Sequence, residues 1–180
     1  MMTILNISLH RVIVTLLGVA LVFAINLAPL QYADAALAKP GGKPLLVVTG
    51  KIKETNVGAE AHLDRALLYS IGLKKLRTSN QYEPGVHDYE GIMLKDLLSF
   101  LGASGMKLIA TALDGYSIEL PIHDAEKYPV ILAMKKNGTA MGIRDKGPIW
   151  IIYPIDQFKE LKDQKYSSRS IWQLNRLDVQ

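Results

Sequence analysis

Two tight-turn dipeptides, each set between short apolar runs, constrain the fold of this 180-residue chain most strongly. They are Asp114-Gly115 and Asn137-Gly138. Asp-Gly and Asn-Gly tolerate the positive φ angles that tight hairpin turns require. The stretch 114–154 is therefore predicted to form a compact β meander. Within it, strands are expected at 116–120, 130–135 and 149–153, and a further strand is expected just before it at 106–113.

The rest of the chain adds short helices and further strands. The clearest helix is predicted at 91–102, because four leucines fall at i, i+3, i+4 and i+7 and Gly102 follows as the C′ residue. A surface excursion is expected at 156–168, and 170–179 fits a closing strand or a short helix. Other segments are a helix at 59–70, one helical turn at 121–127, strands at 45–52 and 73–79, and a loop at 80–90. The sum is an α+β domain, a mixed β-sheet or sandwich with short helices.

Composition excludes several classes of function. The net charge of +4 is mild, and no run of Lys or Arg exceeds two residues, which argues against a nucleic-acid-binding surface. The chain has no cysteine. Disulfides, thiolate metal sites and cysteine nucleophiles are therefore excluded. The length suits one domain.

The N-terminal segment is typical of an export signal. Residues 12–30 carry no charge, and small-x-small patterns end at Ala35 and Ala38. These features predict a signal peptide at 1–38, cleaved after Ala35 or Ala38, and a single mature domain at 39–180 in the periplasm or outside the cell. The alternative is an uncleaved anchor, since 12–30 is just long enough to span a bilayer. In that case the membrane is contacted only through this segment.

Motifs for catalysis are scarce. His62, His87 and His123 have no partner at the spacing of metal ligands. Ser104 does not lie in a Gly-x-Ser-x-Gly nucleophile elbow, and no glycine-rich phosphate loop follows a strand. No catalytic or metal-binding residue is predicted.

The loop at 144–148 is more suggestive, because two cations precede an apolar strand. Arg144 and Lys146 are followed by Gly147-Pro148. One interpretation is a solvated loop with an internal ion pair between Arg144 and Asp145. The other is an anion-binding corner presented from a rigid strand end.

Five short motifs in a fixed order carry a family resemblance. They are an opening strand at 48–50, an aromatic-x-Gly-Ile-x-Leu-x-Asp-Leu-Leu segment at 89–98, an Asp-Gly-Tyr turn within 112–117, a Leu-Ala-x-x-x-Asn-Gly hairpin at 132–138, and a closing Arg-Ser-x-Trp-Gln segment within 169–179. From residue 47 to the C-terminus the chain resembles the molybdopterin-binding domain of sulfite-oxidase-type oxidoreductases. It is most similar to the small stand-alone exported members. The resemblance implies that fold and, as cofactor, molybdopterin.

Two departures from the family bear on activity. In catalytic members a cysteine after the second strand binds molybdenum, whereas the corresponding stretch 77–80 offers the hydroxyls of Thr78 and Ser79. A hydroxyl is a far poorer ligand than a thiolate for this metal. Trp172 aligns with the lysine that helps to hold the pterin phosphate in the family. The resemblance thus implies a fold and leaves the activity open.

The leading hypothesis is a binding module without molybdenum or another cofactor, which binds a small anionic ligand. Thr78, Ser79 and Asn80 would lie at the floor of its pocket, with aromatic walls that include Tyr82. The predicted ligand-binding residues are Thr78, Ser79, Asn80, Tyr116, Arg144, Lys146, Arg169, Ser170 and Trp172. One alternative is a molybdopterin-dependent oxidoreductase with a non-cysteine metal ligand. Another is a domain that docks on a further envelope protein, as an interaction or sensor partner.

Overall fold

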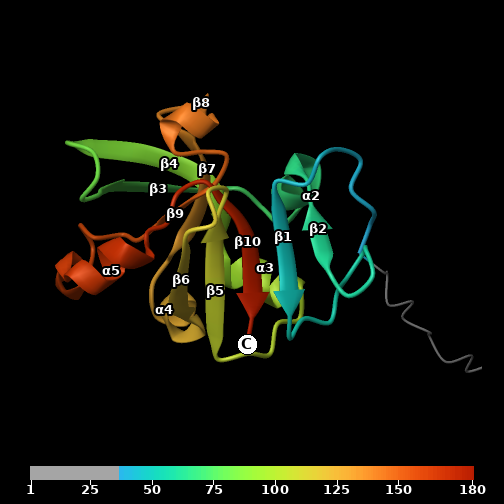
Figure 1. Cartoon of the computed structure of the whole chain (residues 1–180). Helices are drawn as coiled ribbons and strands as arrows, with labels where there is room; N and C mark the ends of the chain where they lie inside the picture. The colour runs from blue at the N-terminus through green and yellow to red at the C-terminus, as the bar shows by residue number, and fades with distance from the viewer. Residues whose placement is uncertain (1–36) are drawn as a thin grey trace, which may run out of the picture. The chain divides into compact units, whose positions relative to one another are not determined.

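The structure, a computed structural model, describes residues 37–180 (Figure 1). The predicted signal peptide lies outside the described residues except for its last two positions. Within 37–180 the chain forms two β-sheets and several short helices. The predicted α+β class, with mixed strand directions and short helices, is confirmed at this level. None of the helices in the described range has the length and apolar character needed to cross a membrane.

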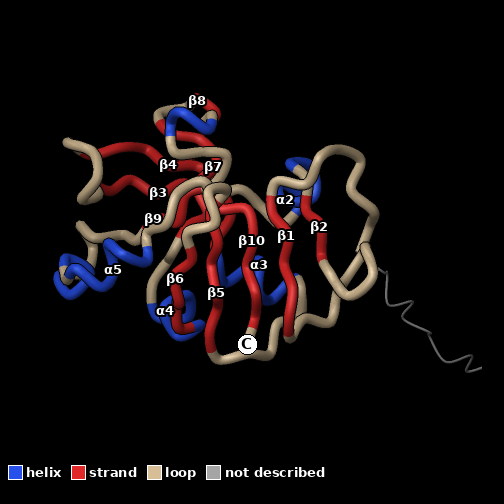
Figure 2. The backbone as a smooth tube through the Cα atoms, viewed as in Figure 1, coloured by secondary structure: helices blue, strands red, loops and turns tan. Residues whose placement is uncertain are grey.

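The first sheet joins the two ends of the described chain. Its strand order is β2 (Ala61–Leu63), β1 (Leu46–Gly50), β10 (Leu174–Val179), β5 (Lys107–Ala112) and β6 (Ser117–Pro121). β1 pairs in parallel with β10, and the other neighbours are antiparallel. The C-terminal strand is therefore central in the sheet (Figure 2).

The second sheet contains the remaining strands. Its order is β3 (Lys74–Ser79), β4 (Val86–Met93), β7 (Ile131–Lys136) and β8 (Thr139–Ala140), and β9 (Trp150–Ile152) also pairs with β7. The helices are α2 (Arg65–Ser70), α3 (Leu94–Phe100), α4 (Ile122–Lys127) and α5 (Gln164–Arg169), with 3-10 turns η1 (Ile143–Asp145) and η2 (Lys159–Lys162).

Two separate groups of buried side chains support these sheets. The large core is mostly aliphatic and includes the leucine stripe of α3, Leu108 and Leu177, all buried. The small cluster lies on the second sheet and centres on Trp150 and Tyr89. Its other buried members are Leu76, Ile131, Ala133, Met141 and Ile152. The cleft described below borders the small cluster.

The predicted tight turns are confirmed, but the predicted β meander over 114–154 is wrong, because β6 lies in the first sheet, α4 follows it, and β7, β8 and β9 lie in the second sheet. Gly115 has a φ of 87°, and Asn137 and Gly138 have φ of 50° and 80°. Both positions therefore use backbone that Gly and Asn tolerate. The ambiguous segment 170–179 contains a strand, β10, and no helix.

Three predicted elements are wrong in part. Residues 61–63 form a strand, and the helix begins only at Arg65, after Asp64 accepts a hydrogen bond from the Leu67 backbone N–H at 2.9 Å. The predicted loop 80–90 becomes strand β4 from Val86, and that strand continues through Gly91 to Met93. The helix predicted at 91–102 therefore begins only at Leu94. Gly91 is required in β4, because a Cβ would lie 2.0 Å from the Leu132 carbonyl oxygen.

The segment 156–168 is not a purely exposed excursion. It contains η2 and most of α5, and Leu161 and Tyr166 are buried in the large core. The sequence did not indicate that Leu161 and Tyr166 are buried, because each is an isolated apolar position among charged and polar residues. The C-terminal part of this segment leads directly into the candidate site.

Candidate functional site

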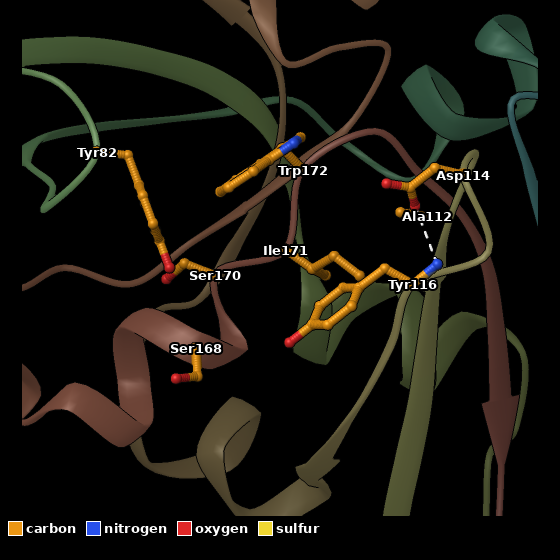
Figure 3. A pocket seen from close by; sticks show the side chains of 8 residues that line it. All are labelled: Tyr82, Ala112, Asp114, Tyr116, Ser168, Ser170, Ile171 and Trp172. Atoms are coloured by element: carbon orange, nitrogen blue, oxygen red, sulfur yellow. Dashed lines mark hydrogen bonds between the residues drawn. The ribbon is translucent and has the colours of Figure 1, made fainter.

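A cleft of about 360 Å³ lies where three separate segments meet (Figure 3). The loop after β3 contributes Tyr82, α5 contributes Ser168, and the chain after α5 contributes Ser170, Ile171 and Trp172. The third segment is the end of β5 and the tight turn that follows. The lining residues are Tyr82, Ala112, Asp114, Tyr116, Ser168, Ser170, Ile171 and Trp172. This volume is in the range of small-molecule sites.

Exposed aromatic rings form the walls of the cleft. Tyr82, Tyr116 and Trp172 are 39%, 54% and 36% exposed, and the only other aromatic side chain this exposed within residues 37–180 is Phe100. Figure 3 shows the three rings on different sides of the cleft. Tyr82 and Trp172 meet edge to face, with centroids 4.9 Å apart and ring planes at 76°. Exposed apolar surface gathered in one hollow is typical of a binding site.

Hydrogen bonds to the small cluster and to α5 hold two of these walls in place. The Tyr82 hydroxyl donates to the Ser167 carbonyl oxygen at 2.7 Å. The buried indole N–H of Trp150 donates to the Ser170 carbonyl oxygen at 3.0 Å, and the Trp150 and Trp172 rings form a T-shaped pair with centroids 6.5 Å apart. Partial burial, with a smaller contribution from nearby Tyr116, raises the pKa of the Tyr82 phenol. Tyr82 therefore stays neutral at physiological pH.

Asp114 is the only residue with a formal charge in the lining of the cleft. One of its carboxylate oxygens, Oδ1, accepts a hydrogen bond from the Tyr116 backbone N–H at 2.9 Å, which fixes the turn. Figure 3 shows this carboxylate at the end of the cleft beside Tyr116. The buried Ser170 hydroxyl donates to the Tyr166 carbonyl oxygen at 3.0 Å. The cleft thus combines three rings with a single negative charge.

Of the nine predicted ligand-binding residues, the structure brings three together in this cleft. They are Tyr116, Ser170 and Trp172, and Tyr82 joins them as the predicted further wall. Asn80 lines a smaller hollow that shares Tyr82 and Ser170 with the cleft.

The polar stretch 78–80 is bonded within the protein. The Ser79 hydroxyl and backbone N–H donate to Asp156 at 2.7 and 2.6 Å, and the buried Thr78 hydroxyl lies 3.4 Å from the same carboxylate. The hydrogen bonds from Ser79 lower the pKa of Asp156. The Asn80 side-chain amide donates to the Tyr89 hydroxyl at 2.6 Å. These groups already have partners and do not line the cleft.

The three predicted basic residues also lie outside the lining of the cleft. Lys146 donates to Glu83 at 3.1 Å, and Lys136 donates to the same carboxylate at 2.9 Å. Burial acts to raise the pKa of Glu83, but the hydrogen bonds from the two lysines outweigh it and lower that pKa. Arg169 donates to the buried Asp124 at 2.8 Å. Arg144 is exposed in η1.

Four lining residues were not predicted from the sequence: Ala112, Asp114, Ser168 and Ile171. Only Asp114 could have been found, because its carboxylate lies two positions before Tyr116, a predicted wall of the pocket. The Asp-Gly pattern by itself predicted only a turn. Among the described residues, no three His, Asp or Glu side chains are grouped so that they could hold a metal ion.

Comparison with known proteins gives no assignment. No protein-family model matches the chain, and no curated protein matches it.

Proposed function

We propose that residues 39–180 form an exported module that binds a small ligand and has the fold of sulfite-oxidase-type molybdopterin-binding domains. The observation that carries this proposal is the cleft walled by three exposed aromatic side chains. Exposed apolar surface that is concentrated in one hollow marks a binding site more often than scattered exposed side chains do. The module acts by binding and not by molybdenum chemistry.

Two of the resemblance motifs support the choice of fold. The Asp-Gly-Tyr turn supplies Asp114 and Tyr116, and the Arg-Ser-x-Trp-Gln segment supplies Ser170 and Trp172. Segments more than 50 positions apart in the chain thus line the same cleft. This is expected if both belong to a pocket inherited from the family.

The residues present do not fit the family's cofactor. The chain lacks the cysteine that binds molybdenum, and the hydroxyl of Ser79 is engaged by Asp156. A cofactor phosphate would also need free cations, whereas Lys146 and Arg169 are held by Glu83 and Asp124. To bind a phosphate, either cation would first have to give up its carboxylate partner, which costs free energy. The alternative of a molybdopterin-dependent oxidoreductase is therefore supported neither by a metal ligand nor by a free cation at these positions.

The ion pairs of Lys146 with Glu83 and of Arg169 with Asp124 also affect which charge the ligand is expected to carry. An anionic ligand was expected on the assumption that Arg144, Lys146 and Arg169 face one pocket. Their positions give that assumption little support, because the lining of the cleft contains no cation. A concave hollow of this volume also favours a small molecule over the flat surface that an envelope partner would bury.

The test is the molybdenum and pterin content of the full chain, expressed with its N-terminal segment in a bacterial host that makes the cofactor. The proposal predicts that the exported protein contains neither. Stoichiometric molybdenum would overturn it and would make Thr78 and Ser79 the next residues to substitute. A catalytic member that retains the cysteine, expressed in parallel, controls for the supply of cofactor.

A further inference from the structure

We infer that the cleft binds an organic cation, a small molecule that carries a methylated ammonium group. The inference rests on the proposed function and names the ligand class of the same site. It follows from the charges around the cleft, from the arrangement of its rings and from its size.

The charges around the cleft favour a positive ligand. Asp114 contributes the only formal charge of the lining, and only one of its oxygens accepts a hydrogen bond from another described residue. The second oxygen can face a bound cation. The nearby cations Lys146 and Arg169 each bind a carboxylate at 3.1 and 2.8 Å, so their charges are compensated locally. An anion entering the cleft would meet Asp114 and no compensating charge.

The rings are arranged as a cation site requires. Tyr82 and Trp172 cross at 76° with centroids 4.9 Å apart, so that their surfaces form a corner. Tyr116 lies across the cleft from that corner (Figure 3). Aromatic faces attract cations through the ring quadrupole, and Trp is the strongest of the three ring types. Rings on several sides of one space are the arrangement that recognises quaternary ammonium groups.

A methylated ammonium group suits this site better than a simple ammonium ion. Three rings line the cleft, and the hydroxyls of Tyr82, Ser168 and Ser170 each donate to a backbone carbonyl oxygen of the protein. A cation whose N–H groups are replaced by methyl groups needs no acceptors and presents apolar surface to the rings. The volume of about 360 Å³ is sufficient for a choline-sized molecule.

The experiment measures binding of choline to the full chain by calorimetry, with the neutral isostere 3,3-dimethylbutan-1-ol and sodium sulfate as matched probes. We expect saturable binding of choline with a Kd of about 1 mM or tighter. The isostere has the same shape without the charge, and we expect about tenfold weaker binding. Sulfate should not bind in the cleft.

Two variants assign the site. Asp114→Asn keeps the acceptor of the turn and removes the charge, so that choline should bind about three- to fivefold more weakly. Tyr116→Ala removes one exposed wall, and we expect a loss of about tenfold. Glu126→Gln removes an exposed carboxylate of α4 that is not in the lining, and choline binding should not change. Thermal unfolding of each variant checks that the protein remains folded.

The same chemistry occurs in free choline compounds and in phosphatidylcholine headgroups. Sedimentation with phosphatidylcholine vesicles, reversed by free choline, would assign the headgroup. Binding of choline without sedimentation would assign the free cation.

The cation inference fails if the isostere binds as tightly as choline or if choline does not bind. It also fails if Asp114→Asn leaves choline affinity unchanged. Binding of sulfate or of the isostere that is lost in Tyr116→Ala would overturn the ligand class and leave the binding module intact. Molybdenum in the exported protein would instead overturn the proposed function itself.

Discussion

The large core and the small cluster differ in what their buried side chains require. The large core is mainly aliphatic, and residues such as Leu108 and Leu177 need only close packing. The small cluster contains Trp150 and Tyr89, whose polar atoms need partners when they are buried. Those partners are the Ser170 carbonyl oxygen and the Asn80 amide, on the two segments that carry the walls of the cleft. The large core therefore mainly stabilises the fold, although its Ala112 and Ile171 reach the cleft, and the small cluster anchors the two segments that carry Tyr82 and Trp172.

The largest effect on stability is expected in the large core. Leu177 in β10 is fully buried, and Leu177→Ala should lower the free energy of unfolding by about 2–5 kcal/mol, measured by urea titration. Leu113→Ala, at a 45% exposed position, is the matched control and should change it by about 0.5 kcal/mol or less. Equal effects of the two substitutions would contradict the assignment of the core. The fraction of Leu177→Ala that remains folded should keep the ligand affinity of the native protein.

A substitution in the small cluster should affect both stability and binding. Trp150→Phe removes the hydrogen bond to the Ser170 carbonyl oxygen and leaves that buried acceptor without its donor. We expect a loss of about 1–3 kcal/mol in the free energy of unfolding. Choline affinity should fall as well, because the segment 170–172 loses its anchor. A variant with lower stability and unchanged affinity would show that the small cluster does not position the site.

The smallest effect is expected at the ion pairs beside the small cluster. The lowered pKa of Glu83 means that its carboxylate stabilises the folded state. This contribution is complete above the ordinary glutamate pKa of about 4.3 and is lost as the pH falls through the lowered folded pKa. Glu83→Gln should therefore cost about 1 kcal/mol or less at pH 7. The difference from the native protein should vanish in acid, and a difference that grows on acidification would contradict the pairing with Lys136 and Lys146.

Local signals in the sequence predicted much of the fold. The leucine spacing of α3 and the turns at Asp114-Gly115 and Asn137-Gly138 depend on neighbours within a few positions. Strand β4 was not predicted because its apolar residues, at 86, 89, 92 and 93, do not alternate with polar ones, and because its first half directly follows Pro84-Gly85. Short strand β2 was not predicted, because its Leu63 continues the helical spacing of the apolar residues in α2.

The candidate site was predictable only in its aromatic part. Tyr116 and Trp172 could be named because they lie in two motifs of the family resemblance, the Asp-Gly-Tyr turn and the Arg-Ser-x-Trp-Gln segment. The pairing of Lys146 with Glu83 joins residues 63 positions apart, and that of Arg169 with Asp124 joins residues 45 apart. Only the tertiary structure shows that these cations have partners. The sequence therefore predicts an anionic ligand, whereas we propose a cation from the charges and rings of the cleft.

The most direct test of the account follows the two indole N–H resonances of the full chain by ¹H–¹⁵N NMR during titration with choline. Trp150 is buried and hydrogen-bonded, whereas Trp172 lines the cleft. The spectrum of Trp172→Phe assigns the two signals. We expect the Trp172 signal to shift and saturate, while the Trp150 signal moves much less. A Trp172 signal that does not respond to choline would contradict the claim that this cleft is the binding site for the cation.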